Sequence, residues 1–451
     1  MENSTVQVQE QIVEKQNLKK ILGVSFGIAI TIGGTIGVGI LRTPGLVAAN
    51  LGSPLLIMLA WILGGIYSFL GTLSSIELAT SIPKAGGWYV YVRRAFGGYG
   101  GFVIGWSDWI ANCATLASIA LAVSEFSAII FPGLQTSIRE IAILIILAFT
   151  IIQWIGLRSG SRTQELTSLI KALIYFAFIF ACFIWGGGKL SGEATETIKM
   201  PSTISAFFFG FIIALQSIIF SYDGWYNIIY FSEEDKNPGK NLPRSAIGGL
   251  LITAVIYLSV NAALLYVLPI SKLASSIAPA TDAAQIIFGA IGSKIITILS
   301  IIALISVLNA VLLIATRIIF GLGRDGLFTP KISAVSKSGT PRSALLLTTA
   351  FVVVLIFSGS VETLIAISAF FYVANYFLGF SSLIYLRKKE PDLDRPFKTW
   401  GYPATTLIFL AGSFVFLIGD IFGDPQNALF ALIFIALTYP AYKFVKRANQ
   451  S

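Results

Sequence analysis

The first long apolar run, Ile21 to about Leu51, contains four glycines within seven positions. They are Gly33, Gly34, Gly37 and Gly39. Each lowers helix propensity by roughly 1 kcal/mol relative to alanine. Within a bilayer, freed backbone is tolerated only where it is buried in protein or lines a polar cavity. Such a break offers N–H groups to an anion and C=O groups to a cation. The alternative is a small-residue packing face, which Gly33 and Gly37 also fit.

A second candidate break is the dipeptide Asp223-Gly224, which is turn chemistry in the middle of another apolar run. A carboxylate there costs roughly 2.5–3.5 kcal/mol on an insertion scale, and such groups usually face a polar interior. Asp223 either contacts a bound ligand or caps the second half of a broken helix, and capping is slightly favoured. Both alternatives require a break.

Besides the two candidate breaks, Lys171 is a single residue that could have a chemical role. It lies about seven residues into the apolar run 164–187, roughly 10 Å deep at 1.5 Å per residue. On its own, this position favours a side chain that snorkels to the interface.

Several kinds of chemistry are excluded by composition. The chain has no histidine, and its two cysteines, Cys113 and Cys182, lie inside apolar runs. We therefore expect no metal site, no cofactor and no disulfide. No nucleophile with a base is found, so an intramembrane enzyme is not predicted. The polar positions are localised at mid-span, which disfavours the continuous pore of a channel.

The composition is that of an all-α polytopic membrane protein. Of 451 residues, 55% are hydrophobic and 12% charged, about half the charged fraction of a soluble protein. We expect one transmembrane domain, 21–445, after a cytosolic tail, 1–20. Twelve apolar runs are long enough to span a bilayer. They lie near 21–50, 54–82, 97–130, 138–157, 164–187, 203–232, 243–269, 292–323, 343–359, 361–386, 403–421 and 427–445.

The basic residues predict the orientation. With the N-terminus inside, the inner segments hold roughly four times as many Lys and Arg residues as the outer ones. Both termini are therefore expected in the cytoplasm. This bias accounts for the net charge of +9 better than a nucleic-acid partner does. The run Glu233-Glu234-Asp235-Lys236 reads as a solvated cytoplasmic helix end.

The two candidate breaks lie in the first and sixth runs, five spans apart. Because five is odd, the second copy enters the membrane from the opposite face. This pattern is typical of an inverted-topology repeat with its ligand held between the breaks. The expected division is repeat one at 21–187, repeat two at 203–386 and two added helices at 403–445.

Four stretches together resemble the amino acid–polyamine–organocation (APC) superfamily, closest to the L-type amino acid transporter branch and its bacterial relatives. They are Gly37-Val38-Gly39-Ile40; Glu77 to Tyr91; Phe220 to Trp225 with Glu233-Glu234 and Asn237-Pro238; and Asn309 through Arg317 to Leu327. Val38 departs from the pattern, because the branch usually has a small hydroxyl residue there.

The resemblance implies a LeuT-like fold with a five-plus-five inverted repeat, broken helices 1 and 6, and alternating access to a midplane amino acid site. A zwitterion needs donors for its carboxylate and acceptors for its ammonium. Amides near Gly37, Val38 and Gly39 suit the carboxylate, aided by the positive end of a helix dipole. Free carbonyls are expected for the ammonium near Thr35, Ile36, Phe220 and Ser221.

The family match also implies roles for individual side chains. Phe220 closes over the substrate from outside. Lys171 takes the place of a sodium ion and braces the broken first helix, which implies sodium independence. A buried lysine can change its protonation state, so proton coupling and simple exchange both stay open. Asn309 and Asn375 match polar positions around the family's cavity. Asn112 and Asp108 could face the cavity, although hydrogen bonding between helices is the commoner use.

We therefore expect sodium-independent secondary transport or exchange of amino acids across the cell membrane. The rival is proton-coupled uptake or antiport of polyamines or other organic amines, which Asp223 favours because such substrates lack a carboxylate. The expected partners are the substrate and the lipid bilayer. No cysteine lies in an outer loop, so no disulfide-linked accessory subunit is expected. The substrate side chain and the oligomeric state stay open.

Overall fold

The computed structural model describes residues 17–187, 204–358, 361–423 and 425–448. Nearly all of these residues lie in helices, and no β-strand occurs among them. One isolated bridge pairs Leu22 with Asp235. Most of the expected cytosolic tail, 1–20, falls outside the described residues.

The first half of the chain opens with a bent helix pair. Helices α2 and α3 meet at an angle of 50°. The pair and the elements after it are α2 (Val24–Thr35), α3 (Gly39–Leu51), α4 (Pro54–Ser81), α5 (Trp88–Phe96), α6 (Gly98–Ile130), η1 (Pro132–Ser137), α7 (Ile138–Ile155) and α8 (Leu157–Trp185).

The second half begins with α9, which ends in a turn rather than continuing as an α-helix. Its elements are α9 (Ile204–Ser221), η2 (Asn227–Phe231), α10 (Pro238–Val267), α11 (Ile270–Ser275), α12 (Pro279–Phe288), η3 (Gly289–Ile291), α13 (Gly292–Arg324), η4 (Pro330–Ser333), α14 (Arg342–Ser358), α15 (Val361–Lys389), α16 (Ala404–Gly423) and α17 (Pro425–Ala448).

Membrane-spanning helices are present. Among the described residues, six helices are long and apolar enough to cross a bilayer, or seven if the bent pair is one span. Three shorter apolar helices lie at 207–221, 342–358 and 404–419. Helices α4 and α8 expose a belt of large apolar side chains that water would not tolerate and lipid would. These include Leu55, Ile62, Ile66, Leu169, Leu173, Phe180 and Ile184.

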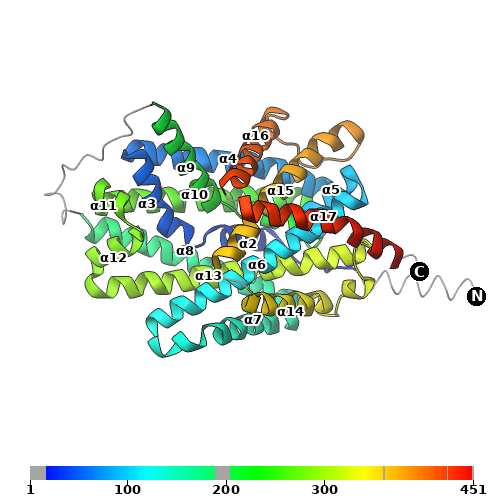
Figure 1. Cartoon of the computed structure of the whole chain (residues 1–451), viewed down its shortest axis with the longest axis horizontal. Coiled ribbons are helices and arrows are strands. Elements are labelled where there is room, and N and C mark those ends of the chain that lie inside the picture. Colours follow the sequence, from blue (N-terminus) through cyan, green and yellow to red (C-terminus); the bar gives the residue numbers. More distant parts are fainter. Residues whose placement is uncertain (1–16, 188–203, 359–360, 424, 449–451) are drawn as a thin grey trace, which may run out of the picture.

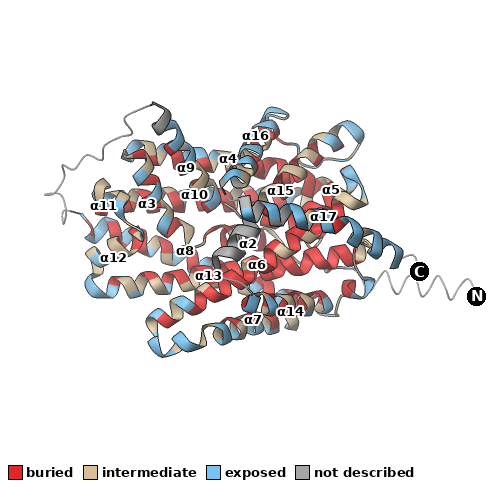
Figure 2. Cartoon of the chain, viewed as in Figure 1, coloured by how far each residue is buried: buried red, intermediate tan, exposed pale blue. Residues whose placement is uncertain are grey.

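The helices form two packed groups that enclose the functional region. In one group α6, α7, α13 and α14 pack on one another, and in the other α10 packs on α2 and α4, and α4 on α9. Figure 1 shows the first group in the lower part of the view, α4, α9 and α10 in the upper part, and α2 near the centre. Burial is densest along α6 and α13 (Figure 2). Helix α8 contacts both groups.

Ion pairs join the two groups at one end. Arg317 on α13 forms a two-pronged pair with Glu234, with both N–O distances 3.1 Å. The exposed fractions of the two side chains are 1% and 0%. Arg324 pairs with Glu233 at 2.7 Å, and Glu233 also accepts the amide of Ala85. The expectation of a solvated end is therefore wrong for Glu234.

We predict that Glu234→Ala destabilises the protein strongly, because it leaves the Arg317 guanidinium buried without an anion. Breaking a buried pair in this way costs about 3–5 kcal/mol. The measurement is the thermal unfolding midpoint of the purified protein in detergent.

The matched control is Glu390→Ala. Glu390 pairs with Arg94 at 2.6 Å, with exposed fractions of 27% and 38%, and hydrogen bonds from Arg94 lower the pKa of the Glu390 carboxyl. Solvent screening limits the loss there to about 0–1 kcal/mol. Equal midpoints for the two variants would contradict the assigned difference between the pairs.

Candidate binding site between two broken helices

The break in the first apolar run lies at 36–38, between α2 and α3. The amides of Gly37, Val38 and Gly39 donate no hydrogen bond to any described residue, and no side chain caps α3. These amides lie at the N-terminal, positive end of the α3 dipole, where backbone N–H groups bind anions. The expected donors are therefore present and free.

The carbonyl side of the same break is occupied by the protein. The Lys171 ammonium on α8 donates to Gly33 O at 2.8 Å and to Ile36 O at 2.6 Å. The Lys171 side chain is only 1% exposed. The Tyr175 hydroxyl, one turn further along α8, donates to Gly37 O at 2.9 Å. Lys171 therefore does not snorkel; its charge ends at the C-terminus of α2, the negative end of that dipole.

The second break follows α9, which ends at Ser221. The chain turns at Gly224 with φ +104° and continues in the short helix η2 from Asn227. No side chain caps η2. The Asp223 carboxylate instead accepts the Tyr376 hydroxyl of α15 at 2.5 Å. The Gly224 amide also hydrogen-bonds to this carboxylate, and a capping role of Asp223 stays a prediction.

The two breaks lie against each other. A Cβ atom on Gly224 would lie 2.7 Å from Gly34 O, so only glycine allows this approach. The Tyr257 hydroxyl of α10 lies 3.0 Å from Thr35 O and 2.7 Å from Ser221 O. One hydroxyl hydrogen is thus shared between the last carbonyls of α2 and α9.

Some glycines of the first break are packed against side chains, and one faces open space. A Cβ on Gly33 would collide with the Gln164 side chain at 1.8 Å, and one on Gly34 with Asn227 at 1.8 Å. A Cβ on Gly37 would meet no heavy atom within 4 Å. The packing interpretation therefore holds for Gly33 and fails for Gly37, which faces open space.

A cavity of about 310 Å³ lies between the breaks and the facing helices α6 and α13. Most of the expected binding residues line it. They are Thr35, Gly37, Val38, Gly39, Phe220, Ser221, Asp223 and Asn112. The Thr35 hydroxyl is buried and has no hydrogen-bond partner among the described residues. The Phe220 side chain is 60% exposed.

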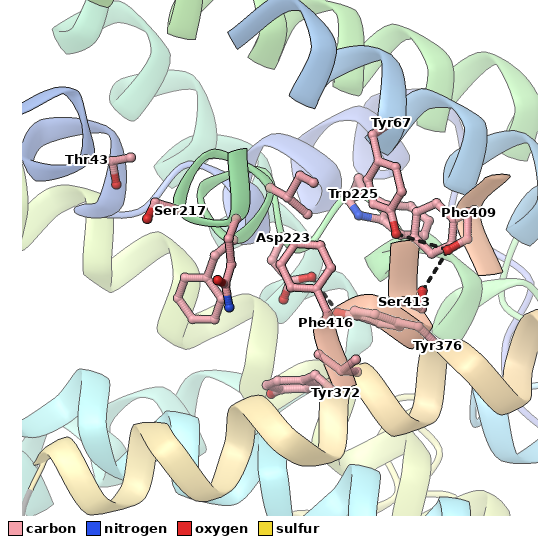
Figure 3. A pocket seen from close by; sticks show the side chains of 14 residues that line it. Thr43, Tyr67, Ser217, Asp223, Trp225, Tyr372, Tyr376, Phe409, Ser413 and Phe416 are labelled. Carbon is pink, nitrogen blue, oxygen red and sulfur yellow. Dashed lines mark hydrogen bonds between the residues drawn. The ribbon is translucent and has the colours of Figure 1, made fainter. Parts of the chain in front are cut away.

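A neighbouring cavity of about 370 Å³ lies between α4, α9, α15 and α16. Its walls are largely aromatic, and Figure 3 shows Trp225, Tyr372, Tyr376, Phe409 and Phe416 around Asp223. The two cavities share Thr43, Phe220, Asp223 and Tyr372. Asp223 therefore lies where the two cavities meet.

The expected free carbonyls are not free. Thr35 O and Ser221 O accept Tyr257, Ile36 O accepts Lys171, and Phe220 O accepts the Asp223 amide at 3.2 Å. Each carbonyl keeps a second lone pair, so an ammonium would share these acceptors. Ile36 does not line the cavity, and its side chain is fully buried.

Three asparagines were expected around the cavity, namely Asn112, Asn309 and Asn375. Only Asn112 lines it. Asn309 donates to Gln164 Oε1 at 2.8 Å, and Ser168, one turn from Gln164, donates to Ala29 O. Asn309 thus supports the α8 surface that holds α2. Asn375 accepts the Ser107 hydroxyl at 3.0 Å and does not reach either cavity.

The sequence did not single out the tyrosines that complete this site. Tyr175, Tyr257 and Tyr376 are buried in apolar helices; the hydroxyls of the first two donate to carbonyls at the breaks, and that of Tyr376 donates to the Asp223 carboxylate. A tyrosine in an apolar run is equally typical of a membrane interface. In the described part of the chain no cluster of His, Cys, Asp or Glu could hold a metal ion. The arrangement is suited to binding a small charged ligand.

We predict that Gly224→Ala lowers the stability of the protein, whereas Gly37→Ala lowers only its affinity for substrate. Alanine at Gly224 is strained by its positive φ and meets the Gly34 backbone, so the loss is roughly 1–3 kcal/mol. Alanine at Gly37 meets nothing, so the unfolding midpoint stays unchanged while substrate affinity falls. Thermal unfolding and substrate saturation curves test the pair; a destabilised Gly37→Ala variant would contradict the open side of this break.

Comparison with known proteins identifies the family. The sequence profile of the amino acid permease family matches residues 22–439. The chain is 32% identical over 443 residues to the serine/threonine exchanger SteT of Bacillus subtilis (strain 168), covering 97% of this chain and 99% of that protein. It is 27% identical to the b(0,+)-type amino acid transporter 1 of Mus musculus, with 93% and 86% covered. It is 28% identical to the large neutral amino acids transporter small subunit 2 of Mus musculus, with 94% and 81% covered.

These relatives are transporters rather than enzymes. The chain therefore belongs to the amino acid permease family, whose members move amino acids across membranes.

Proposed function

We propose that this chain is a sodium-independent secondary transporter or exchanger of amino acids, which works by alternating access across the cell membrane. The observation that carries the proposal is the set of free amides at Gly37, Val38 and Gly39 on the wall of the cavity between the breaks. Every amino acid brings a carboxylate that these donors fit. The free Thr35 hydroxyl and the second lone pairs of nearby carbonyls suit its ammonium.

Sodium independence rests on Lys171. A sodium ion at a broken helix is coordinated by freed carbonyl oxygens. Here the Lys171 ammonium binds two such oxygens, Gly33 O and Ile36 O, from within the chain. The position is filled by a covalently attached cation, so a free sodium ion would compete with a fixed charge.

The proposed architecture has twelve membrane spans in a LeuT-like five-plus-five inverted repeat. Repeat one is 21–187, repeat two is 203–386, and two helices are added at 403–445. The contact between a break after α2 and a break after α9 supports this division, because matching interruptions are the mark of such repeats. The inward excess of Lys and Arg supports cytoplasmic termini.

The rival substrate class is polyamines or other organic amines, taken up or exchanged with protons. Asp223 favours it, since this carboxylate lies on both cavities and makes no ion pair among the described residues. Against it stand the free amides, which a substrate without a carboxylate leaves unused. The relatives differ in their named substrates, but all are named for amino acids.

Counterflow in proteoliposomes tests the proposal. Vesicles loaded with unlabelled serine, threonine, leucine, arginine or putrescine are diluted into the labelled form of the same compound. We expect accumulation of at least one amino acid, at the same rate in sodium and in choline chloride. Accumulation of putrescine alone would favour the rival, and a strict need for sodium would contradict the role of Lys171.

We predict that Lys171→Met lowers counterflow at least tenfold. The variant loses two hydrogen bonds from a charged donor, each worth about 1.5–3 kcal/mol, and leaves two buried carbonyls unpaired. Lys240→Met, at an exposed position on α10, is the matched control and stays near the wild-type rate. If Lys171→Met transports normally, its ammonium does not brace the site.

A further inference from the structure

Asp108 is a buried acid that the binding site does not use. It lies ten residues into α6, about 15 Å from the start of the helix at 1.5 Å per residue, and is 0% exposed. Helix α6 has 33 residues, so this position lies within the span and away from both ends of the helix. Buried carboxylates in such places are costly and are usually functional.

Both oxygens of Asp108 accept hydrogen bonds from neutral groups. The Tyr230 hydroxyl of η2 donates to Oδ2 at 2.8 Å, and the Asn112 amide donates to Oδ1 at 3.0 Å. The Asn375 side chain on α15 also faces the carboxylate, but its amide nitrogen makes no hydrogen bond to any described residue. None of the ion pairs in the described ranges includes Asp108.

The surroundings supply no compensating positive charge. The titratable groups that face Asp108 are Tyr226 and Tyr230 from the second break and Tyr372 from α15. The other helices packed on α6, namely α5, α7, α13, α14 and α17, place no charged group against it among the described residues. A carboxylate without a cation in this setting is stabilised by hydrogen bonds alone, and protonation relieves the cost of its charge.

The hydrogen bond from Tyr230 joins α6 to η2, the short helix that follows the second break. Asp108 belongs to α6, which packs on α7, α13 and α14, whereas η2 contacts α2, α4 and α10 as well as α13. Asn112, the second donor, lines the binding cavity. Movement of η2 away from α6 therefore removes the Tyr230 hydroxyl from Asp108. The hydrogen bond from Asn112 then still links the carboxylate to the cavity.

We propose that Asp108 binds one proton in each transport cycle, with Tyr230 as the positioning residue that decides when. The proposal rests on alternating access by the proposed amino acid transporter. While η2 lies against α6, the ionised carboxylate accepts Tyr230. When they separate, one proton passes from a hydronium ion of the aqueous phase to Asp108 Oδ2, which leaves a water molecule and a neutral carboxylic acid. Reclosure returns Tyr230 and releases that proton to water.

Two transport assays with one protein separate this proposal from the function itself. Counterflow at equal pH needs only exchange, whereas uptake driven by an inside-alkaline pH gradient needs a proton site. The probe is labelled serine, threonine or leucine, whichever gives the largest counterflow. For wild type we expect the gradient to raise initial uptake severalfold, with alkalinisation of the medium reported by a pH-sensitive dye. For Asp108→Asn we expect counterflow within about threefold of wild type and no response to the gradient.

Glu140→Gln is the matched control, because it removes an exposed carboxylate at the start of α7; its gradient response stays at the wild-type level. Wild type without a gradient response, or Asp108→Asn with one, overturns the proposal while counterflow still supports transport. If Asp108→Asn lacks counterflow, Tyr230→Phe decides. Its gradient-driven uptake shifts toward alkaline pH because the carboxylate loses a donor, and an unchanged pH profile overturns the proposal.

Discussion

The structure depends on the contact between the Lys171 ammonium and two carbonyl oxygens at the end of α2. An unpaired ammonium and unpaired carbonyls are each costly in a low-dielectric interior. The break releases Gly33 O and Ile36 O from helical pairing, and Lys171 reaches both within 2.8 Å. Each partner therefore removes the cost of burying the other. The interruption of α2 and α3 is stable for this reason, and it leaves the amides on the far side of the break free.

The hydroxyls of buried tyrosines extend this arrangement to the second break. The Tyr175 hydroxyl donates a hydrogen bond to Gly37 O, and the Tyr257 hydroxyl lies within hydrogen-bond distance of both Thr35 O and Ser221 O. A hydroxyl can satisfy a carbonyl without bringing a second charge to the breaks. The ion pairs of Glu233 and Glu234 lie beyond η2, where they join the second break to α13. Neutral donors thus satisfy the carbonyls of the two breaks, and charged groups hold the chain beyond η2 to α13.

Sequence alone predicted the elements that rest on strong local signals. The glycine run identified the first break, and Asp223-Gly224 identified the second, because both contradict the helix expected of an apolar run. Most helices begin and end within a few residues of the apolar runs, but α8 begins at Leu157, seven residues before its run, and α9 ends at Ser221, eleven residues before the end of its run. The number of membrane spans and the repeat stay predictions, as do the binding roles.

Other features could not be read from the chain, because they depend on which residues meet. The sequence left capping open for Asp223, whose partner Tyr376 lies more than 150 positions away. The free carbonyls were misjudged for the same reason: the tyrosine and lysine donors come from α8 and α10. Asn309 and Asn375 were placed near the cavity from a family pattern. Their actual partners, Gln164 and Ser107, are set by helix packing.

The free amides at Gly37, Val38 and Gly39 have a consequence for divergence within this family. A ligand that is bound by peptide N–H groups depends on atoms that a point substitution rarely removes. Side chains around the same cavity, such as Val38, Ile119 and Val307, can change freely without disturbing that binding. Under the proposed function, recognition of the part common to all amino acids is separate from recognition of the part that distinguishes them, so new specificities can evolve one wall residue at a time.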